Sequence, residues 1–81
     1  MNSAYLRKIV SDEFRELLMF AGLVKDYHCK TKVLDNKGKT LYYSFETNIG
    51  ECQVHSSKTI LVNKKMCRSL TAARYEIYKY L

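Results

Sequence analysis

The sequence predicts an α+β domain in the order helix, three or four antiparallel strands, helix, the α-β-β-β-α arrangement. Apolar residues recur every three or four positions at both ends of the chain, whereas the middle alternates between apolar and polar residues, as strands do. The 81 residues are 47% hydrophobic and contain no proline, which is typical of one compact domain over residues 1–81. We expect both helices to pack on one face of the sheet.

Residues 63–81 have the clearest amphipathic pattern and are expected to form the last helix. Asn63 stands where an N-cap residue is expected. The apolar residues that share one side of this helix are Met66, Leu70, Ala73, Ile77 and Leu81.

The first helix is expected over residues 3–21, and Gly22 supplies a C-terminal stop. Ser11 is followed by two acidic residues, so an alternative has the helix begin there and residues 3–10 form a separate turn. The apolar residues with helical spacing are Leu6, Val10, Phe14, Leu17, Leu18 and Ala21.

Alternation with a period of two predicts the strands. The first strand begins near Lys25, the second covers residues 41–46, and the Asn and Gly within residues 35–39 favour a tight turn between them. A third strand covers residues 51–55. Residues 59–62 are β-prone, and they form either a fourth short strand or a loop. In the first strand the residues expected to face the core are Tyr27, Cys29, Thr31 and Val33.

The composition limits the classes of function. A formal charge of +6 fits nucleic acid, an acidic partner surface or a solvated basic surface. The three cysteines, Cys29, Cys52 and Cys67, are an odd number without disulfide spacing, which predicts the reducing cytoplasm or nucleus. Charged residues interrupt the N-terminal stretch early, so we expect neither a signal peptide nor a membrane span.

The sequence carries few signals for an enzyme active site or a metal site. No nucleophile motif surrounds the cysteines and there is no Gly-rich phosphate loop, so we expect a non-enzyme without a cofactor. His28, Cys29, Cys52 and His55 could supply zinc ligands. Strand alternation places the cysteines and histidines on opposite sheet faces, and we therefore expect no metal site.

The closing stretch NKKMCRSLTAARYEIYKYL resembles the last helix of the double-stranded-RNA-binding domain, a family whose order is also helix, three strands, helix. The segment YYSFETNIGECQVHSS is similar to a narrower group, the third domain of Dicer-partner proteins of the Loquacious and TAR RNA-binding protein type. Ser56 stands where that group has glycine. The resemblance points to a divergent nematode member acting in RNA interference.

This resemblance implies a domain that binds proteins. In that group the third strand pairs with the same strand of a second copy, and another surface binds the helicase region of Dicer. It therefore implies a homodimer that docks on a Dicer-like ribonuclease, with weak RNA binding of its own. The residues expected at the dimer interface are Glu51, Cys52, Gln53, Val54, His55, Ile60, Leu61 and Val62.

The alternative is an RNA-binding domain that contacts phosphates through the start of its last helix, at Lys64, Lys65 and Arg68. The loop at residues 35–39 lacks the Gly-Pro-x-His that RNA-binding members of the family carry. That departure favours protein binding over RNA binding.

Overall fold

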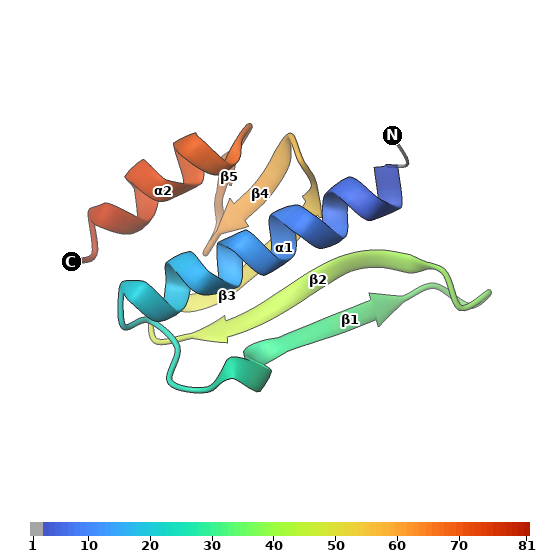
Figure 1. Ribbon diagram of the computed structural model, residues 1–81, viewed down its shortest axis with the longest axis horizontal. Helices are drawn as coiled ribbons and strands as arrows, with labels where there is room; N and C mark the ends of the chain where they lie inside the picture. The colour runs from blue at the N-terminus through green and yellow to red at the C-terminus, as the bar shows by residue number, and fades with distance from the viewer. Residues whose placement is uncertain (1–2) are drawn as a thin grey trace.

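The computed structural model describes residues 3–81 and confirms the α+β class, with two helices on a five-stranded antiparallel sheet (Figure 1). Residues 1 and 2, which the predicted domain range includes, lie outside the described residues. The elements are α1 (Ser3–Phe20), a short 3₁₀ turn η1 (Tyr27–Cys29), β1 (Lys30–Leu34), β2 (Thr40–Thr47), β3 (Gly50–Ser56), β4 (Thr59–Val62), β5 (Lys65–Cys67) and α2 (Leu70–Tyr78).

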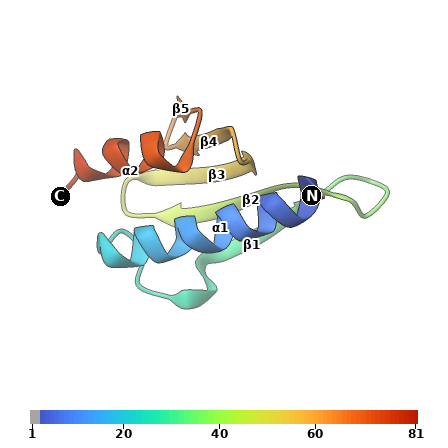
Figure 2. The ribbon, with the colours of Figure 1, turned by 45° about the horizontal axis from the view of Figure 1, so that its top comes forward.

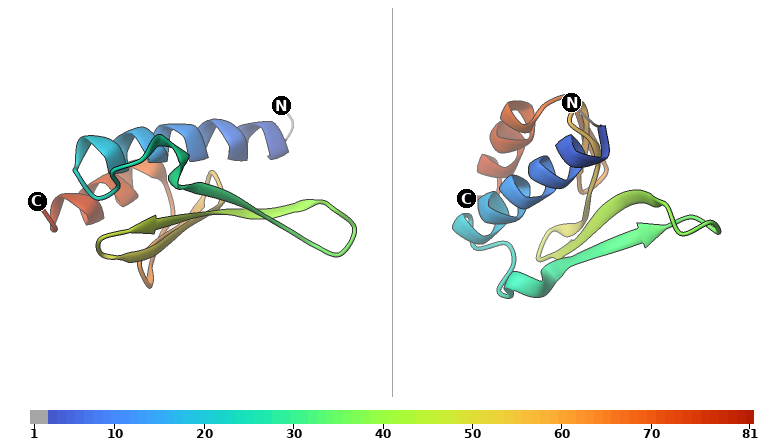
Figure 3. Two further views of the ribbon diagram at one scale, coloured as in Figure 1. Left: turned by 90° about the horizontal axis from the view of Figure 1, so that it is seen from below. Right: turned by 45° about the vertical axis from the view of Figure 1, so that its right-hand side comes forward.

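The strands follow one another across the sheet in the order β1-β2-β3-β4-β5, each antiparallel to the next. Both helices cover the same face, as expected: α1 contacts β2 and β3, and α2 contacts β4 and β5 (Figure 3). The helices run in similar directions, so their C-terminal ends lie at the same end of the molecule (Figures 1 and 2). The sheet's other face is left open.

The core lies between the helices and one row of paired strand residues. This row crosses four strands and consists of Tyr43, Val54, Ile60 and Cys67. Phe14 of α1 meets Phe45 of β2 edge-on, with the ring centroids 5.3 Å apart. Ala73 and Ile77 of α2 are fully buried against the same core. Burial of this apolar surface is the main stabilising contribution to the fold.

Helix α1 is continuous, so the alternative start at Ser11 is wrong. The Ser11 hydroxyl is buried and donates to the carbonyl of Lys8 at 2.7 Å, a bond made inside a helix. Gly22 ends the helix as predicted, with a positive φ of 73°. Its N–H donates to Met19, and the N–H of Leu23 donates to Leu18 at 2.9 Å, which together form a Schellman motif.

The last helix begins at Leu70, so the prediction that it begins after Asn63 is wrong. Asn63 instead lies in the β4–β5 turn with φ 57°, a conformation that Asn tolerates better than most residues. The N-cap is Ser69, whose hydroxyl accepts the N–H of Ala72 at 3.0 Å. Met66, expected on the buried side of a helix, is 48% exposed on β5.

The first strand begins five residues later than predicted, because residues 27–29 form η1. Its expected facing is wrong for Thr31 and Val33, whereas Cys29 of η1 packs against the core as expected. Lys30 pairs with Phe45 and Lys32 with Tyr43, so the lysines lie on the helix side of the sheet and Thr31 lies on the open face. The turn at residues 35–39 is present, closed by a 2.8 Å bond from the Asp35 N–H to the Lys39 carbonyl. Residues 59–62 form the fourth strand.

Candidate functional site

The third strand was expected to be a sheet edge that pairs with a second copy, and this is wrong. Strand β3 is central, and its backbone groups bond to β2 on one side and β4 on the other. Four of the expected interface residues are fully buried in the core: Cys52, Val54, Ile60 and Val62. In the described part of the chain the sheet edges are β1 and β5.

The other four expected interface residues lie on the open face of the sheet, and three of them are bonded to one another. Glu51 accepts hydrogen bonds from Ser44 and from Gln53, the latter at 3.0 Å, and these bonds lower the pKa of Glu51. His55 lies 2.7 Å from Gln53. Leu61 pairs with Gln53 across β3 and β4. This surface is a chain of mutually satisfied polar groups.

The ring of His55 stacks on Tyr42 with centroids 4.5 Å apart. Burial, and next the positive charge of Arg7, lower the pKa of His55, which favours the neutral ring. Cys52 lies in the core while His55 lies on the open face, so strand alternation separates the two as expected. Among residues 3–81, no group of three or more His, Cys, Asp or Glu side chains is placed to hold a metal ion.

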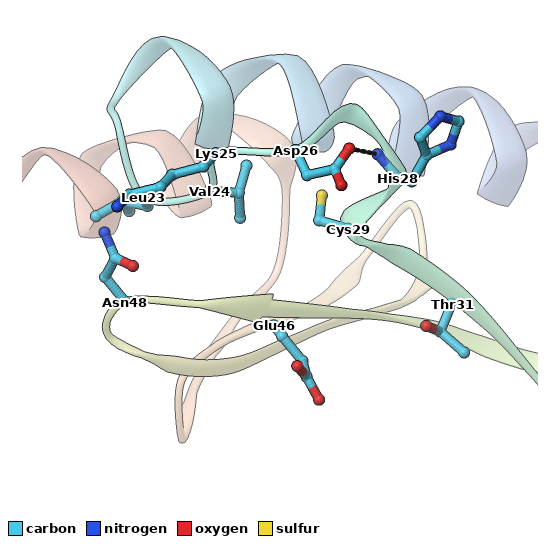
Figure 4. Close-up of a pocket in the computed structure, with 9 residues that line it drawn as sticks. All are labelled: Leu23, Val24, Lys25, Asp26, His28, Cys29, Thr31, Glu46 and Asn48. Atoms are coloured by element: carbon cyan, nitrogen blue, oxygen red, sulfur yellow. Dashed lines mark hydrogen bonds between the residues drawn. The ribbon is translucent and has the colours of Figure 1, made fainter.

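A hollow of about 460 Å³ lies between the segment after α1 and the β2–β3 turn (Figure 4). Asp26 accepts the N–H of His28 at 2.8 Å and thereby caps η1. The ring of His28 points away from the sulfur of Cys29 (Figure 4), and burial raises the pKa of the Cys29 thiol. A thiol whose pKa is raised in this way is a poor nucleophile. The lining residues are Leu23, Val24, Lys25, Asp26, His28, Cys29, Thr31, Glu46 and Asn48.

Asp12 of α1 joins three basic side chains, a cluster that the sequence reasoning missed. Its carboxylate lies 2.6 Å from the Lys30 ammonium, 3.3 Å from the Arg15 guanidinium and 3.7 Å from the Lys8 ammonium. The Lys30 hydrogen bond is the main reason that the pKa of Asp12 is lowered. Arg15 also lies over the ring of Tyr27, 4.0 Å from its centroid. The cluster therefore ties α1 to η1 and β1.

The three basic residues of the RNA-binding alternative are exposed, but the structure does not bring them to a helix start. Lys64 lies in the β4–β5 turn and Lys65 is the first residue of β5. The N-cap residue Ser69 comes after the C-terminal end of β5. Three residues of strand span roughly 10 Å. Arg68 alone is adjacent to Ser69, so the expected cluster of three cations at a helix N-terminus is wrong.

A groove lined by both apolar and charged residues lies between the two helices. It has a volume of about 510 Å³ and opens on the side of the helices away from the sheet. Its α1 wall consists of Glu13, Glu16, Leu17 and Phe20, and its α2 wall consists of Leu70, Arg74 and Tyr78. These positions follow spacings of three and four, so each wall is one stripe along a helix.

Phe20 stands at the rim of this groove with 82% of its surface exposed, and Tyr78 opposite is 43% exposed. The sequence contained a signal for this groove, since Leu17 and Leu18 are both apolar and only one of them is needed to face the sheet. Leu18 is fully buried, whereas Leu17 lines the groove. The partner wall could not be located because the last helix was expected to begin too early.

A scan against protein-family models and searches of curated proteins and of solved structures found no significant match to this chain. Within residues 3–81, neither helix combines the length and the hydropathy that a bilayer crossing requires.

Proposed function

We propose that this chain is a non-catalytic protein-interaction domain of the double-stranded-RNA-binding-domain type, which joins copies of its own protein and docks on a Dicer-like ribonuclease in RNA interference. The α+β layout and the sequence resemblance support the class. The observation that carries the interaction role is the groove between α1 and α2, with Phe20 82% exposed at its rim. A large aromatic side chain held in water beside an apolar groove is typical of a protein-binding surface.

Two further apolar side chains near the end of the chain are exposed. Tyr75 on α2 is 66% exposed, and Leu81, which follows the helix, is 69% exposed. Tyrosine suits such a surface because its ring supplies buried area while its hydroxyl remains a hydrogen-bonding group. The end of the molecule at which both helices finish is therefore the favoured place for a protein partner.

The direct test is calorimetric titration of the intact chain with the helicase region of a Dicer-like ribonuclease and, separately, with a duplex RNA. We expect saturable binding to the helicase region with a negative heat-capacity change, the signature of apolar burial. Failure to bind the helicase region, together with submicromolar binding to duplex RNA, would overturn the proposal.

One observation favours RNA binding as a second candidate. Arg7 of α1 donates from its guanidinium to the carbonyl of Leu41, near the start of β2, at 3.3 Å. The preceding β1–β2 turn carries Lys37 and Lys39, and this turn projects at the end of the molecule where α1 begins (Figure 1). Phosphate contacts there would give an affinity that falls steeply with salt.

A further inference from the structure

The groove between α1 and α2 contains charges of both signs that are not paired with each other. Glu13 and Glu16 line its α1 wall and Arg74 lines its α2 wall. Within residues 3–81, none of these three side chains takes part in a hydrogen bond or an ion pair. The acids of α1 therefore lack a partner cation, and the cation of α2 lacks a partner acid.

This arrangement is complementary to itself. A two-fold axis running along the groove places α1 of one copy over α2 of the other, and the same contact occurs twice. The acids of each α1 then face Arg74 of the other copy. In the same way, the exposed Phe20 ring of each copy packs on the exposed Tyr78 ring of the other copy. A two-fold axis perpendicular to the groove would instead oppose acid to acid, which is disfavoured.

The location also suits a second copy on grounds of net charge. The chain carries +6 overall, so two copies repel at most orientations. The groove does not share this excess of positive charge, because two acids and one base line it, and a contact between two grooves can form two Glu16–Arg74 pairs that offset the repulsion. We propose that the groove between α1 and α2 binds the same groove of a second copy of this chain, with Glu16 of each copy paired to Arg74 of the other.

This inference rests on the proposed function in that it names one protein partner and the surface that binds it. The test is sedimentation velocity of the intact chain at about 100 μM, well above a micromolar dissociation constant. We expect wild-type protein to sediment as a dimer. Glu16→Arg alone and Arg74→Glu alone are each expected to weaken the dimer at least about tenfold, because each places like charges opposite one another twice.

Mixing the two variants is the decisive step. In a mixed dimer the arginine introduced at position 16 faces the glutamate introduced at position 74, and the native Glu16 faces the native Arg74. Sedimentation over a range of concentrations should therefore give each variant alone a dimer dissociation constant at least about tenfold higher than that of an equimolar mixture of the two. Only the arrangement with α1 over α2 predicts this recovery.

The matched controls are Glu46→Arg and Arg68→Glu, the same charge changes at exposed positions outside the groove, and both should leave the dimer intact. Phe20→Ser provides a charge-neutral probe, and because its side chain is 82% exposed the variant should retain a native circular dichroism spectrum. We expect that variant to weaken the dimer at least about tenfold as well.

Monomeric wild-type protein at about 100 μM, or a mixture of the two charge variants whose dimer is no stronger than that of either variant alone, would overturn the inference. Titration of the wild-type chain with the Dicer-like helicase region, at a concentration below that at which it dimerises, separates this result from the proposed function. Helicase binding with no wild-type dimer means that the self-association surface is wrong and the docking role stands. A dimer without helicase binding means that the self-association surface stands and the docking on a Dicer-like ribonuclease is wrong.

Discussion

Asp12 is the residue whose ionisation is most directly coupled to the stability of the fold. Its carboxylate accepts from Lys30, 18 positions further along the chain, at 2.6 Å. The fold favours the ionised form, because the pKa of Asp12 lies below its ordinary value of 3.8. Its contribution to stability is therefore present above that ordinary value and is lost as the pH falls through the lower folded-state pKa.

We expect Asp12→Asn to lower the free energy of unfolding at about pH 7 and to have a much smaller effect near pH 3, where the wild-type carboxyl is also becoming protonated. Urea unfolding followed by circular dichroism at the two pH values measures this difference. The neighbouring Glu13→Gln variant is the control, since Glu13 makes no ion pair with a described residue. Equal destabilisation by Asp12→Asn at both pH values would contradict the assignment.

Ile60 and Leu61 are adjacent residues with opposite roles. Ile60 is fully buried between the sheet and α2, whereas Leu61 lies on the open face beside Gln53. We expect Ile60→Ala to destabilise the fold by about 2–5 kcal/mol and Leu61→Ala by less than half as much. Urea unfolding of the two variants gives the comparison directly. A larger loss at Leu61 would mean that β4 faces the other way.

The start of α2 is the element on which the sequence and the structure differ most. Ser69→Ala should destabilise the fold by about 1 kcal/mol, because it removes the acceptor for the Ala72 N–H. Asn63→Gly should cost nothing or stabilise slightly, since φ at Asn63 is 57° and glycine adopts that conformation freely. If Asn63→Gly were the more harmful change in an unfolding titration, the helix would begin at residue 63 after all.

The early helix start was predicted because two periodicities coincide. Met66 and Leu70 are four apart, which fits a helix. In the structure, however, residues 65–67 form a short edge strand in which the first two residues are exposed and the third is buried. By residue type alone, Asn63 and Ser69 are equally good caps. Only the pairing of Ile60 with Cys67, a tertiary contact, decides between them.

The elements with an unambiguous local signal were predicted well. Helix α1, the Gly22 stop and the turn that begins at Asp35 each follow from side-chain spacing and turn chemistry. The facing of β1 was not predictable in this way. Lys30 lies on the helix side because its ammonium forms an ion pair with Asp12 of α1. Asp12 is far away in the sequence, so no local pattern around Lys30 indicates this partner. The central position of β3 depends likewise on β4, the segment at residues 59–62 that the sequence left as either a strand or a loop.

At the scale of the whole molecule, the helix groove and the basic β1–β2 turn belong to different regions. The groove runs between α1 and α2. The two helices end at one end of the molecule, whereas the start of α1 and the β1–β2 turn lie at the opposite end (Figure 1). One end therefore suits a protein partner, and the other carries the basic residues that would meet phosphate.

If the basic end makes few phosphate contacts, duplex RNA should bind only in the non-specific range of about 10⁻⁴–10⁻⁶ M at physiological salt. Lys37→Glu with Lys39→Glu should weaken that binding further and reduce its salt dependence, while leaving self-association unchanged. Fluorescence anisotropy with a labelled duplex at several salt concentrations measures both quantities. Submicromolar binding that these two changes abolish would favour the RNA-binding alternative.

The central claim is that the helix groove is a protein-binding surface that a second copy fills. Isotope-filtered nuclear Overhauser spectroscopy on an equal mixture of carbon-13-labelled and unlabelled chains at about 100 μM tests it most directly, because it detects only contacts between copies. We predict cross-peaks between the Phe20 ring of one copy and the Tyr78 ring of the other. An absence of intermolecular cross-peaks, or cross-peaks confined to β1 or β5, would contradict it.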